Sequence, residues 1–362
     1  MHLNGYGVEE IQIVARPIGM VLGGLIGVGF SIIPVKLLLG KNFGEFRLVL
    51  ISNTEELIGQ PSVGYNTYLL NVQTTGTSMI SLHKCSDLSS ILDLKAQYLQ
   101  SLLAPMDGMW ESIINSSPHW EIRMDREQAG YYAANDEGTL LQFYVRSAFQ
   151  EYGRTLFDHV IAQGTLTRAI VSTIDPSFLS LCLDVQKKLT VQTYLYEIHT
   201  EVCPSHPEAD GLDFRLIKAS ELDQTIAFQQ ACLCSEKDLS GWLRGYSANL
   251  IERKELFVLC RNGEWLGLGE CRKSDSQQGV TDLGMMVIPA HRGKGWATYI
   301  LTYLSTYSTA HGQHAICSTT VENVGAQKAI IRSGFTSRHR ILNVELPRCS
   351  GSSALCVHEH HE

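Results

Sequence analysis

One stretch of the sequence decides the fold: Met286-Val287-Ile288-Pro289-Ala290-His291-Arg292-Gly293-Lys294-Gly295-Trp296-Ala297-Thr298. An apolar run stops at a proline, and a short basic turn with two glycines then opens a segment rich in tyrosine and leucine. This order predicts a strand, a turn and a helix. Glycines let a ligand approach the backbone, and the first turn of a helix presents unpaired N–H groups. The stretch therefore predicts a phosphate-binding turn, and the alternative is an ordinary turn with solvated basic side chains.

A second block follows at Asn323-Val-Gly-Ala326-Gln-Lys-Ala-Ile330-Ile-Arg-Ser-Gly334-Phe335. Together the two blocks resemble the GNAT superfamily of acyl-CoA-dependent N-acyltransferases. Its first block reads Arg/Gln-x-x-Gly-x-Gly/Ala and its second Asn-x-x-Ala-x-x-x-Tyr-x-x-x-Gly-Phe. The resemblance covers residues 210–348. Isoleucine stands at position 330, where the family often has a tyrosine that protonates the leaving thiolate, so the sequence identifies no general acid.

The resemblance implies acetyl-CoA, or another acyl-CoA, as cosubstrate and direct transfer of the acyl group to a primary amine. The backbone amides of 292–297 would hold the pyrophosphate, and the backbone of Met286 and Ile288 would bracket the thioester carbonyl. Asn323 would lie beside the pantetheine arm. The implied cofactor-binding residues are Met286, Val287, Ile288, Arg292, Gly293, Lys294, Gly295, Trp296, Ala297, Thr298 and Asn323.

The reaction needs a neutral amine, so a base should lie within reach. Alternation along the strands puts Glu270 on one face with Leu266 and Arg272, and a hairpin centred near residue 276 pairs Glu270 with Asp282. Two adjacent carboxylates raise each other's pKa. We therefore expect Asp282 as the base and Glu270 as the partner that tunes it; the alternative is a pair of solvated charges at the strand ends.

Other reactive side chains leave alternatives open. His314 or Cys317 could point into the same cleft, although each is also typical of a strand end or a core. The terminal Cys356-Val-His358-Glu-His360-His361 tract could bind a metal, but a flexible tail explains it better, and we expect no metal. A non-catalytic acyl-CoA sensor or scaffold is the alternative to an enzyme, motivated by Ile330.

The order of predicted elements favours an α/β fold with a mixed sheet and two tandem GNAT-like domains. We expect a glycine-rich N-terminal domain of unknown role at 1–74, a degenerate GNAT-like domain at 79–200, the catalytic domain at 210–348 and a flexible tail at 349–362. In the degenerate copy the turn reads Val145-Arg-Ser-Ala-Phe-Gln-Glu-Tyr-Gly153-Arg-Thr, with one glycine and a glutamate where a phosphate would approach. The layout resembles mycothiol synthase, and this copy would wall the substrate cleft.

Composition limits the partners. The 362 residues carry a formal charge of −8, which excludes a basic nucleic-acid-binding surface. Residues 1–209 hold that charge, whereas residues 210–348 are slightly basic. The acidic half favours an acceptor amine with several positive charges. Ten cysteines without a CxxC spacing indicate free thiols in a reducing compartment, so we expect a cytoplasmic protein.

The N-terminal part holds a segment that challenges this location. Residues 17–35 are uncharged, which makes them a candidate membrane anchor. They contain five glycines, so buried strands broken by glycine turns are the favoured interpretation. Strands are expected nearby at Ile11–Ala15, Phe46–Ile51 and Tyr68–Val72. The sequence says nothing about the oligomeric state.

Overall fold

The computed structural model describes residues 46–52, 66–72, 79–206, 211–233 and 239–347, in two compact units that divide between Thr77 and Ser78. In the first unit, β1 (Phe46–Ser52) and β2 (Asn66–Val72) form an antiparallel pair, which confirms two of the expected strands. The expected strand at 11–15, the uncharged segment at 17–35 and the tail at 349–362 lie outside the described residues.

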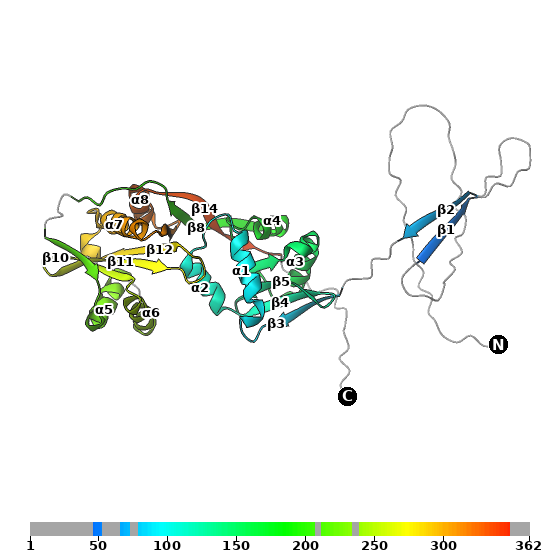
Figure 1. Ribbon diagram of the computed structural model, residues 1–362, viewed down its shortest axis with the longest axis horizontal. Helices are drawn as coiled ribbons and strands as arrows, with labels where there is room; N and C mark the ends of the chain where they lie inside the picture. The colour runs from blue at the N-terminus through cyan, green and yellow to red at the C-terminus, as the bar shows by residue number, and fades with distance from the viewer. Residues whose placement is uncertain (1–45, 53–65, 73–78, 207–210, 234–238, 348–362) are drawn as a thin grey trace, which may run out of the picture. The chain divides into compact units, whose positions relative to one another are not determined.

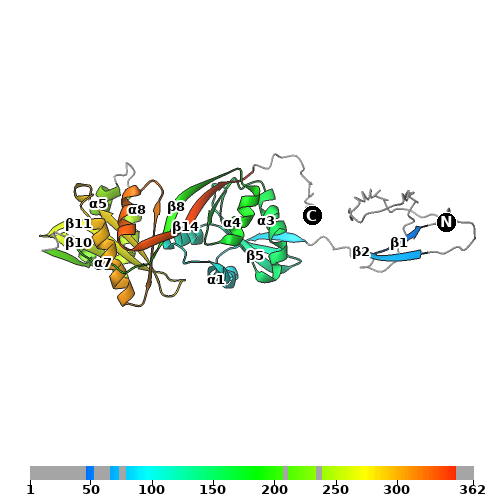
Figure 2. The same cartoon turned by 90° about the horizontal axis from the view of Figure 1, so that it is seen from above.

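The second unit is built on one mixed sheet of twelve strands, with helices on both faces (Figures 1 and 2). Its first half contains β3 (Ile80–Lys84), α1 (Leu92–Ser101), α2 (Gly108–Ser116), β4 (His119–Met124), β5 (Glu127–Ala134), β6 (Thr139–Val145), α3 (Gly153–Ala162), β7 (Arg168–Ser172), α4 (Pro176–Val185) and β8 (Lys188–Ile198). Its second half contains β9 (Leu212–Leu216), α5 (Leu222–Leu233), α6 (Ser240–Glu252), β10 (Leu256–Arg261), β11 (Glu264–Lys273), β12 (Val280–Val287), α7 (Trp296–Ala310), β13 (His314–Thr320), α8 (Val324–Arg332) and β14 (Phe335–Glu345).

The two halves repeat one arrangement. The order β6-α3-β7-α4-β8 in the first half matches β12-α7-β13-α8-β14 in the second. In each half the first two strands of this series pair in parallel, as a strand–helix–strand crossover requires. In the second half, α7 and α8 cover one face of the sheet, and α5 and α6 cover the other (Figure 1). The tandem α/β fold expected from the sequence is confirmed.

The halves exchange their last strands. Around the centre the strand order is β7-β14-β8-β13, so β14 of the second half pairs with β7 of the first, and β8 of the first half pairs with β13 of the second. The long strands β8 and β14 also pair with each other and cross from one half to the other (Figure 2). Each half therefore completes the other's sheet, and the second unit folds as one body.

Two local features differ from the sequence-based expectation. The helix α2 was not expected; its N-cap is Asp107, whose side chain accepts from the Trp110 N–H. The strand β11 has a bulge opposite Leu259 and Cys260, where Leu266 has no partner on β10. Because of this extra residue, the Leu266 side chain packs on the face of the sheet that α7 covers, whereas the Leu268 side chain packs on the face that α5 and α6 cover. The expected common face of Leu266 and Glu270 is therefore wrong.

The strand exchange makes a direct prediction about fragments. Residues 211–347 alone should show no cooperative thermal transition by circular dichroism, because β13 then lacks β8 and β14 lacks both neighbours. Residues 79–347 should melt in one transition and serve as the control. A fragment 211–347 that melts cooperatively at the same temperature would show that the exchange contributes nothing to folding.

Candidate functional site

The turn between β12 and α7 presents a cluster of backbone donors. A short 3₁₀ turn at Pro289–His291 is followed by Gly293 with φ 76° and Gly295 with φ 93°, both in the left-handed region that favours glycine. Within the described residues, the backbone amides of 293–298 donate no hydrogen bond. These unpaired groups stand at the N-terminus of a fifteen-residue helix, so the turn has the chemistry of an anion site.

The basic side chains of this turn make contacts within the protein. The Arg292 guanidinium donates to the Val287 carbonyl at 3.1 Å and to the Cys232 carbonyl at 2.6 Å, so it braces the turn against β12 and α5. The Lys294 Nζ lies 3.3 Å from the His291 Nδ1. Arg292, one of the implied cofactor-binding residues, therefore has backbone carbonyl partners for its guanidinium, and its contact with a cofactor stays a prediction.

A contact that the sequence did not indicate lies beside the turn. The His206 ring stacks on the Trp296 indole with 3.7 Å between ring centroids, and its Nε2 lies 2.7 Å from the Lys294 carbonyl oxygen. His206 belongs to the segment that joins the two halves. The one sequence signal near His206 is the pair of prolines at positions 204 and 207.

The turn forms one wall of a cavity of about 630 Å³, which we call the loop cavity. The lining combines the turn, the end of β12, the end of α5 and residues along the length of α8. Among the sequence-predicted residues, those that line it are Met286, Val287, Arg292, Gly293, Gly295, Trp296, Ala297, Thr298 and Asn323. Ile288 and Lys294 are not part of the lining.

A second cavity of about 320 Å³, which we call the carboxylate cavity, adjoins the first. The strands β12 and β13 pair only from Val280 to Asp282 and then separate. Both cavities are lined by residues from the region of separation, namely Leu233, Met285, Met286, Asn323 and Ala326. The two cavities therefore meet where β12 leaves β13, and a thioester bound along β12 could be reached from the other side.

The register of β12 decides which backbone amides face this gap. The Ile288 N–H donates to the Leu266 carbonyl at 3.1 Å, so it points towards β11 and away from the gap. Backbone groups alternate in direction along an antiparallel strand, so the Met286 N–H also points towards β11 and those of Met285 and Val287 point into the gap. This register does not agree with the expected bracket of Met286 and Ile288, because the amides that face the gap are those of Met285 and Val287.

The expected carboxylate pair also has a different register. A hydrogen bond from the Ser274 N–H to the Val280 carbonyl closes the turn, so the hairpin centres one residue later than expected. As a result, Glu270 pairs with Gly284, and Arg272 pairs with Asp282. The guanidinium of Arg272 lies between the carboxylates, with its Nε 3.5 Å from the Glu270 Oε2 and its Nη2 2.8 Å from the Asp282 Oδ2. The predicted direct cross-strand pairing of Glu270 with Asp282 is wrong.

Asp282 is enclosed by both halves of the second unit. Its Oδ2 accepts from the Gly108 N–H at 3.0 Å, at the N-terminus of α2, and from Arg272. Burial raises the pKa of Asp282 to about 7; the nearby Asp107 carboxylate adds to the increase, Glu270 adds less, and Arg272 and the Gly108 amide oppose it. A Cβ at position 108 would lie 3.2 Å from the Asp282 Oδ2, so a residue larger than glycine would press against this carboxylate.

Glu270 reaches towards the gap between the strands. Its Oε2 accepts from the Tyr246 hydroxyl at 2.6 Å, and its side chain lies over Gly284, where a Cβ would stand 3.2 Å from that oxygen. Gly284 comes one residue before Met285, whose amide faces the gap. The absence of a side chain at Gly284 therefore lets the Glu270 carboxylate lie next to the place where β12 separates from β13.

Unpaired polar atoms gather in this one place. Four buried side-chain atoms of the described residues have no hydrogen-bond partner. Three of them, Gln229 Nε2, Arg272 Nε and Asp282 Oδ1, belong to side chains that line the carboxylate cavity. Buried unpaired polar atoms are rare and concentrate at functional sites. The carboxylate cavity is therefore the best candidate for the reacting end of a ligand site.

The first half contains a filled counterpart of this site. The Gln150 side chain donates to the Val145 carbonyl at 2.6 Å, just as Arg292 donates to Val287 five residues earlier. However, a 3₁₀ helix at Ser147–Tyr152 runs directly into α3, and Gly153 has an ordinary helical φ of −51°. This geometry explains why the copy looks degenerate in sequence: the glycine turn that opens the backbone is missing.

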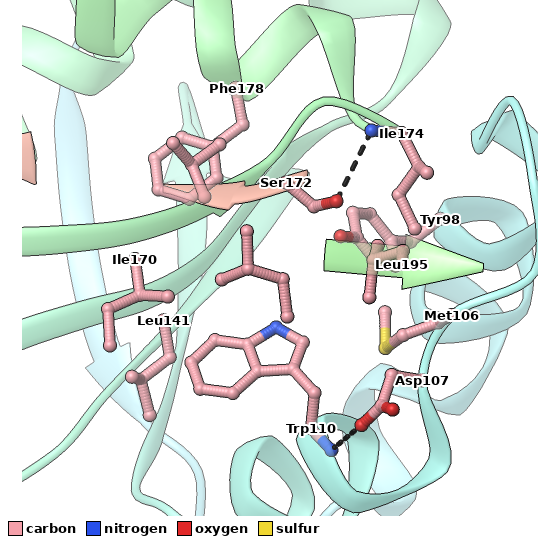
Figure 3. Close-up of a pocket in the computed structure, with 12 residues that line it drawn as sticks. Tyr98, Met106, Asp107, Trp110, Leu141, Ile170, Ser172, Ile174, Phe178 and Leu195 are labelled. Carbon is pink, nitrogen blue, oxygen red and sulfur yellow. Dashed lines mark hydrogen bonds between the residues drawn. The ribbon is translucent and has the colours of Figure 1, made fainter. Parts of the chain in front are cut away.

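The gap between β6 and β7 is filled by side chains as well. These strands pair only at their first two positions and then separate. The strands β12 and β13 of the second half separate in the same way. The Trp110 indole of α2 lies among Leu141, Ile170 and Leu195 (Figure 3). The remaining cavity is about 10 Å³, which is room for about one water molecule. No acyl-CoA fits there.

The remaining candidates lie as follows. The His314 Nε2 is 3.0 Å from the Glu197 Oε2 at a half-exposed strand end. Cys317 is buried in the carboxylate cavity, and burial raises its pKa well above the usual value, which disfavours a thiolate nucleophile. Ile330 also lines this cavity. Within the described ranges there is no group of three side chains that could hold a metal ion.

Comparisons with known proteins agree with this geometry. A family model described as "Acetyltransferase (GNAT) domain" matches residues 87–199, and one described as "Acetyltransferase (GNAT) family" matches residues 222–335. A solved acetyltransferase of the GNAT family from Colwellia psychrerythraea is 34% identical, with 74% of this chain and 100% of that chain covered and a TM-score of 0.68. The chain belongs to the GNAT family.

More distant structures support the tandem fold. A GCN5-related N-acetyltransferase from Sphaerobacter thermophilus is 16% identical with a TM-score of 0.52, over 73% of this chain and 94% of that one. A tandem GNAT protein from the clavulanic acid biosynthesis pathway is 11% identical with a TM-score of 0.53, over 74% and 98%. No curated protein matches the sequence. The likeness to mycothiol synthase stays a prediction.

The family makes this chain an acyl-CoA-dependent acetyltransferase. Among the residues that the structure describes, no helix is both long and apolar enough to cross a membrane, and the segment 17–35 lies outside them. The cytoplasmic location stays a prediction.

The contact between α2 and Asp282 can be tested with one methyl group. Gly108→Ala should lower turnover about tenfold, or ~1.4 kcal/mol, because the new Cβ displaces the Asp282 carboxylate, while acetyl-CoA affinity stays unchanged. The control is Gly153→Ala, at the start of α3, where a Cβ meets nothing within 4 Å. Steady-state kinetics on both variants measures the effect. Equal rates for Gly108→Ala and the parent protein would show that the contact of α2 with Asp282 does not affect turnover.

Proposed function

We propose that the second half of the sheet transfers an acyl group, most simply acetyl, from acyl-CoA directly to a primary amine. The observation that carries this proposal is the junction of the two cavities at the gap between β12 and β13. The loop cavity has unpaired amides for a pyrophosphate, and the carboxylate cavity has the groups for an amine. The acyl group would pass between them without a covalent enzyme intermediate.

The cofactor would be held mainly by backbone groups. The amides of 293–298 would bind the pyrophosphate, and the amides of Met285 and Val287 would donate to the thioester carbonyl and the pantetheine arm. The Asn323 side chain, which lines both cavities and caps α8 by accepting from the Ala326 N–H, would lie beside that arm. Donors aimed at the carbonyl stabilise the oxyanion that forms when the amine attacks.

Glu270 is the better candidate for the base. The sequence favoured Asp282, but both ends of that carboxylate are enclosed: Oδ2 is bonded to Gly108 and Arg272, and Oδ1 is covered. Glu270 lies beside the gap and would take the ammonium proton, directly or through a water. Asp282 would then hold the Arg272 guanidinium that orients Glu270, and the departing thiolate would be protonated by water, because Ile330 has no proton to give.

The base assignment predicts a pH-dependent defect. Glu270→Gln should lower kcat about 10²–10⁴-fold at neutral pH, and the loss should shrink as the pH approaches the pKa of the free amine, because the amine then needs no base. Asp282→Asn should reduce the rate less. A pH–rate profile of both variants measures this. An Asp282→Asn defect that exceeds that of Glu270→Gln at every pH would restore the sequence-based assignment.

The glycine turn provides a matched test of cofactor binding. Gly293→Ala and Gly312→Ala both put a Cβ on left-handed backbone, with φ 76° and 69°, and neither Cβ meets an atom within 4 Å. Each should cost ~1–2 kcal/mol of stability. Calorimetry should show weaker acetyl-CoA binding for Gly293→Ala only, by about tenfold, because Gly293 lines the loop cavity. Equal affinities for the two variants would place the cofactor elsewhere.

The second candidate function is a non-catalytic acyl-CoA sensor. Ile330 and the filled first copy favour it, since a sensor needs neither a general acid nor a second site. Release of free thiol from acetyl-CoA over a panel of primary amines distinguishes the two. Turnover well above hydrolysis on any amine excludes the sensor.

A further inference from the structure

The carboxylate cavity is small. Its volume of about 320 Å³ lies at the low end of the range for ligand pockets. It is lined by α2, α5 and α6 as well as the strands, through residues such as Met109, Leu233 and Trp242. The space suits a small molecule better than a folded protein.

The charged side chains that line the cavity, which we call its floor, have a net charge that suits a ligand with one positive charge. Among the described residues, three charged side chains line it: the carboxylates of Glu270 and Asp282 and the guanidinium of Arg272. Because Arg272 lies within ion-pair distance of both carboxylates, these three side chains together carry at most one net negative charge, and the other buried carboxylate near Asp282, that of Asp107, does not line the cavity. An amine with several positive charges would bring cations for which this floor has no partner.

The wall above this floor is aromatic and apolar. Trp242 is 56% exposed and lies nearly parallel to Tyr246, with 4.9 Å between ring centroids and 11° between the planes. Tyr246 in turn donates to Glu270, so the aromatic pair leads from the surface to the carboxylate. Leu233 is 41% exposed and also lines the cavity. Among the described residues, eleven large apolar side chains are exposed, and two of them, Trp242 and Leu233, line this cavity.

We propose that the acceptor is an apolar primary monoamine, whose ammonium binds at Glu270 and whose hydrocarbon or aromatic body lies against Trp242. This inference rests on the proposed acyl transfer and names its substrate class. It departs from the polycationic acceptor that the acidic composition favoured, because, among the described residues, no charged side chain that lines the cavity comes from residues 1–209. The aromatic faces also stabilise an ammonium beside them.

The test compares apolar monoamines with polycationic amines, among which hexylamine and 1,4-diaminobutane have similar lengths. 2-Phenylethylamine and hexylamine represent the proposed class, and 1,4-diaminobutane, spermidine and an aminoglycoside represent polycations. At neutral pH, kcat/KM with acetyl-CoA should be at least about tenfold higher for the monoamines. Higher kcat/KM for the polycations would overturn the proposal.

Variants of Trp242 test the wall itself. Trp242→Ala should raise KM for 2-phenylethylamine by about tenfold. The change in KM should be smaller for methylamine, which is too short to reach the indole. Trp242→Phe should return KM for 2-phenylethylamine most of the way to the value of the parent protein. Acetyl-CoA affinity should stay unchanged, because Trp242 does not line the loop cavity. Leu183→Ala, on a comparably exposed apolar side chain of α4, is the control. Equal changes for 2-phenylethylamine and methylamine would contradict the proposal.

A binding measurement separates this inference from the proposed function. Calorimetry of 2-phenylethylamine with protein saturated by free CoA needs no turnover. If 2-phenylethylamine binds the parent protein and not Trp242→Ala, the monoamine site is supported even when no amine is acetylated. Absence of acetylation would in that case contradict only the proposed acyl transfer. No binding of 2-phenylethylamine, together with acetylation of spermidine, would defeat the inference and leave the acyl transfer intact.

Discussion

The separation of β12 from β13 after three paired residues is the constraint on which the site depends. A strand that leaves its neighbour exposes backbone donors and acceptors, and buried backbone groups need partners. Here the exposed edge of β12 joins the loop cavity to the carboxylate cavity. In the proposed function, the glycine turn at one end of the gap provides the pyrophosphate site and Glu270 beside it provides the base. In the first half the same gap exists, but the Trp110 indole fills it.

The exchange of β8 and β14 explains why a filled copy is kept in the fold. Because β8 pairs with β13, the first half supplies one neighbour of the strand that borders the active gap. The first half also brings the N-terminus of α2 to Asp282 and Met109 to the wall of the carboxylate cavity. The first half thus contributes to the wall of the carboxylate cavity, and its role in an acceptor site stays a prediction.

The sequence predicted the elements of the second unit well, because their apolar periodicity is clear and because Gly293 and Gly295 mark the turn. It did not predict contacts that depend on register or on distant segments. The hairpin of β11 and β12 is centred one residue later than its symmetry suggested, which placed Arg272 rather than Glu270 opposite Asp282. The strand exchange, the Gly108 contact and the bracing role of Arg292 join residues far apart in the chain, and no local pattern encodes them.

The central claim is that one cofactor site operates in a chain with two copies of the fold. Hydrogen–deuterium exchange with and without acetyl-CoA tests it most directly, because it locates protection along the backbone. The account predicts slower exchange of the amides at 293–298, which donate to no group in the part of the chain that the structure describes, and no change at 147–153. Protection at 147–153, or none at 293–298, would contradict it.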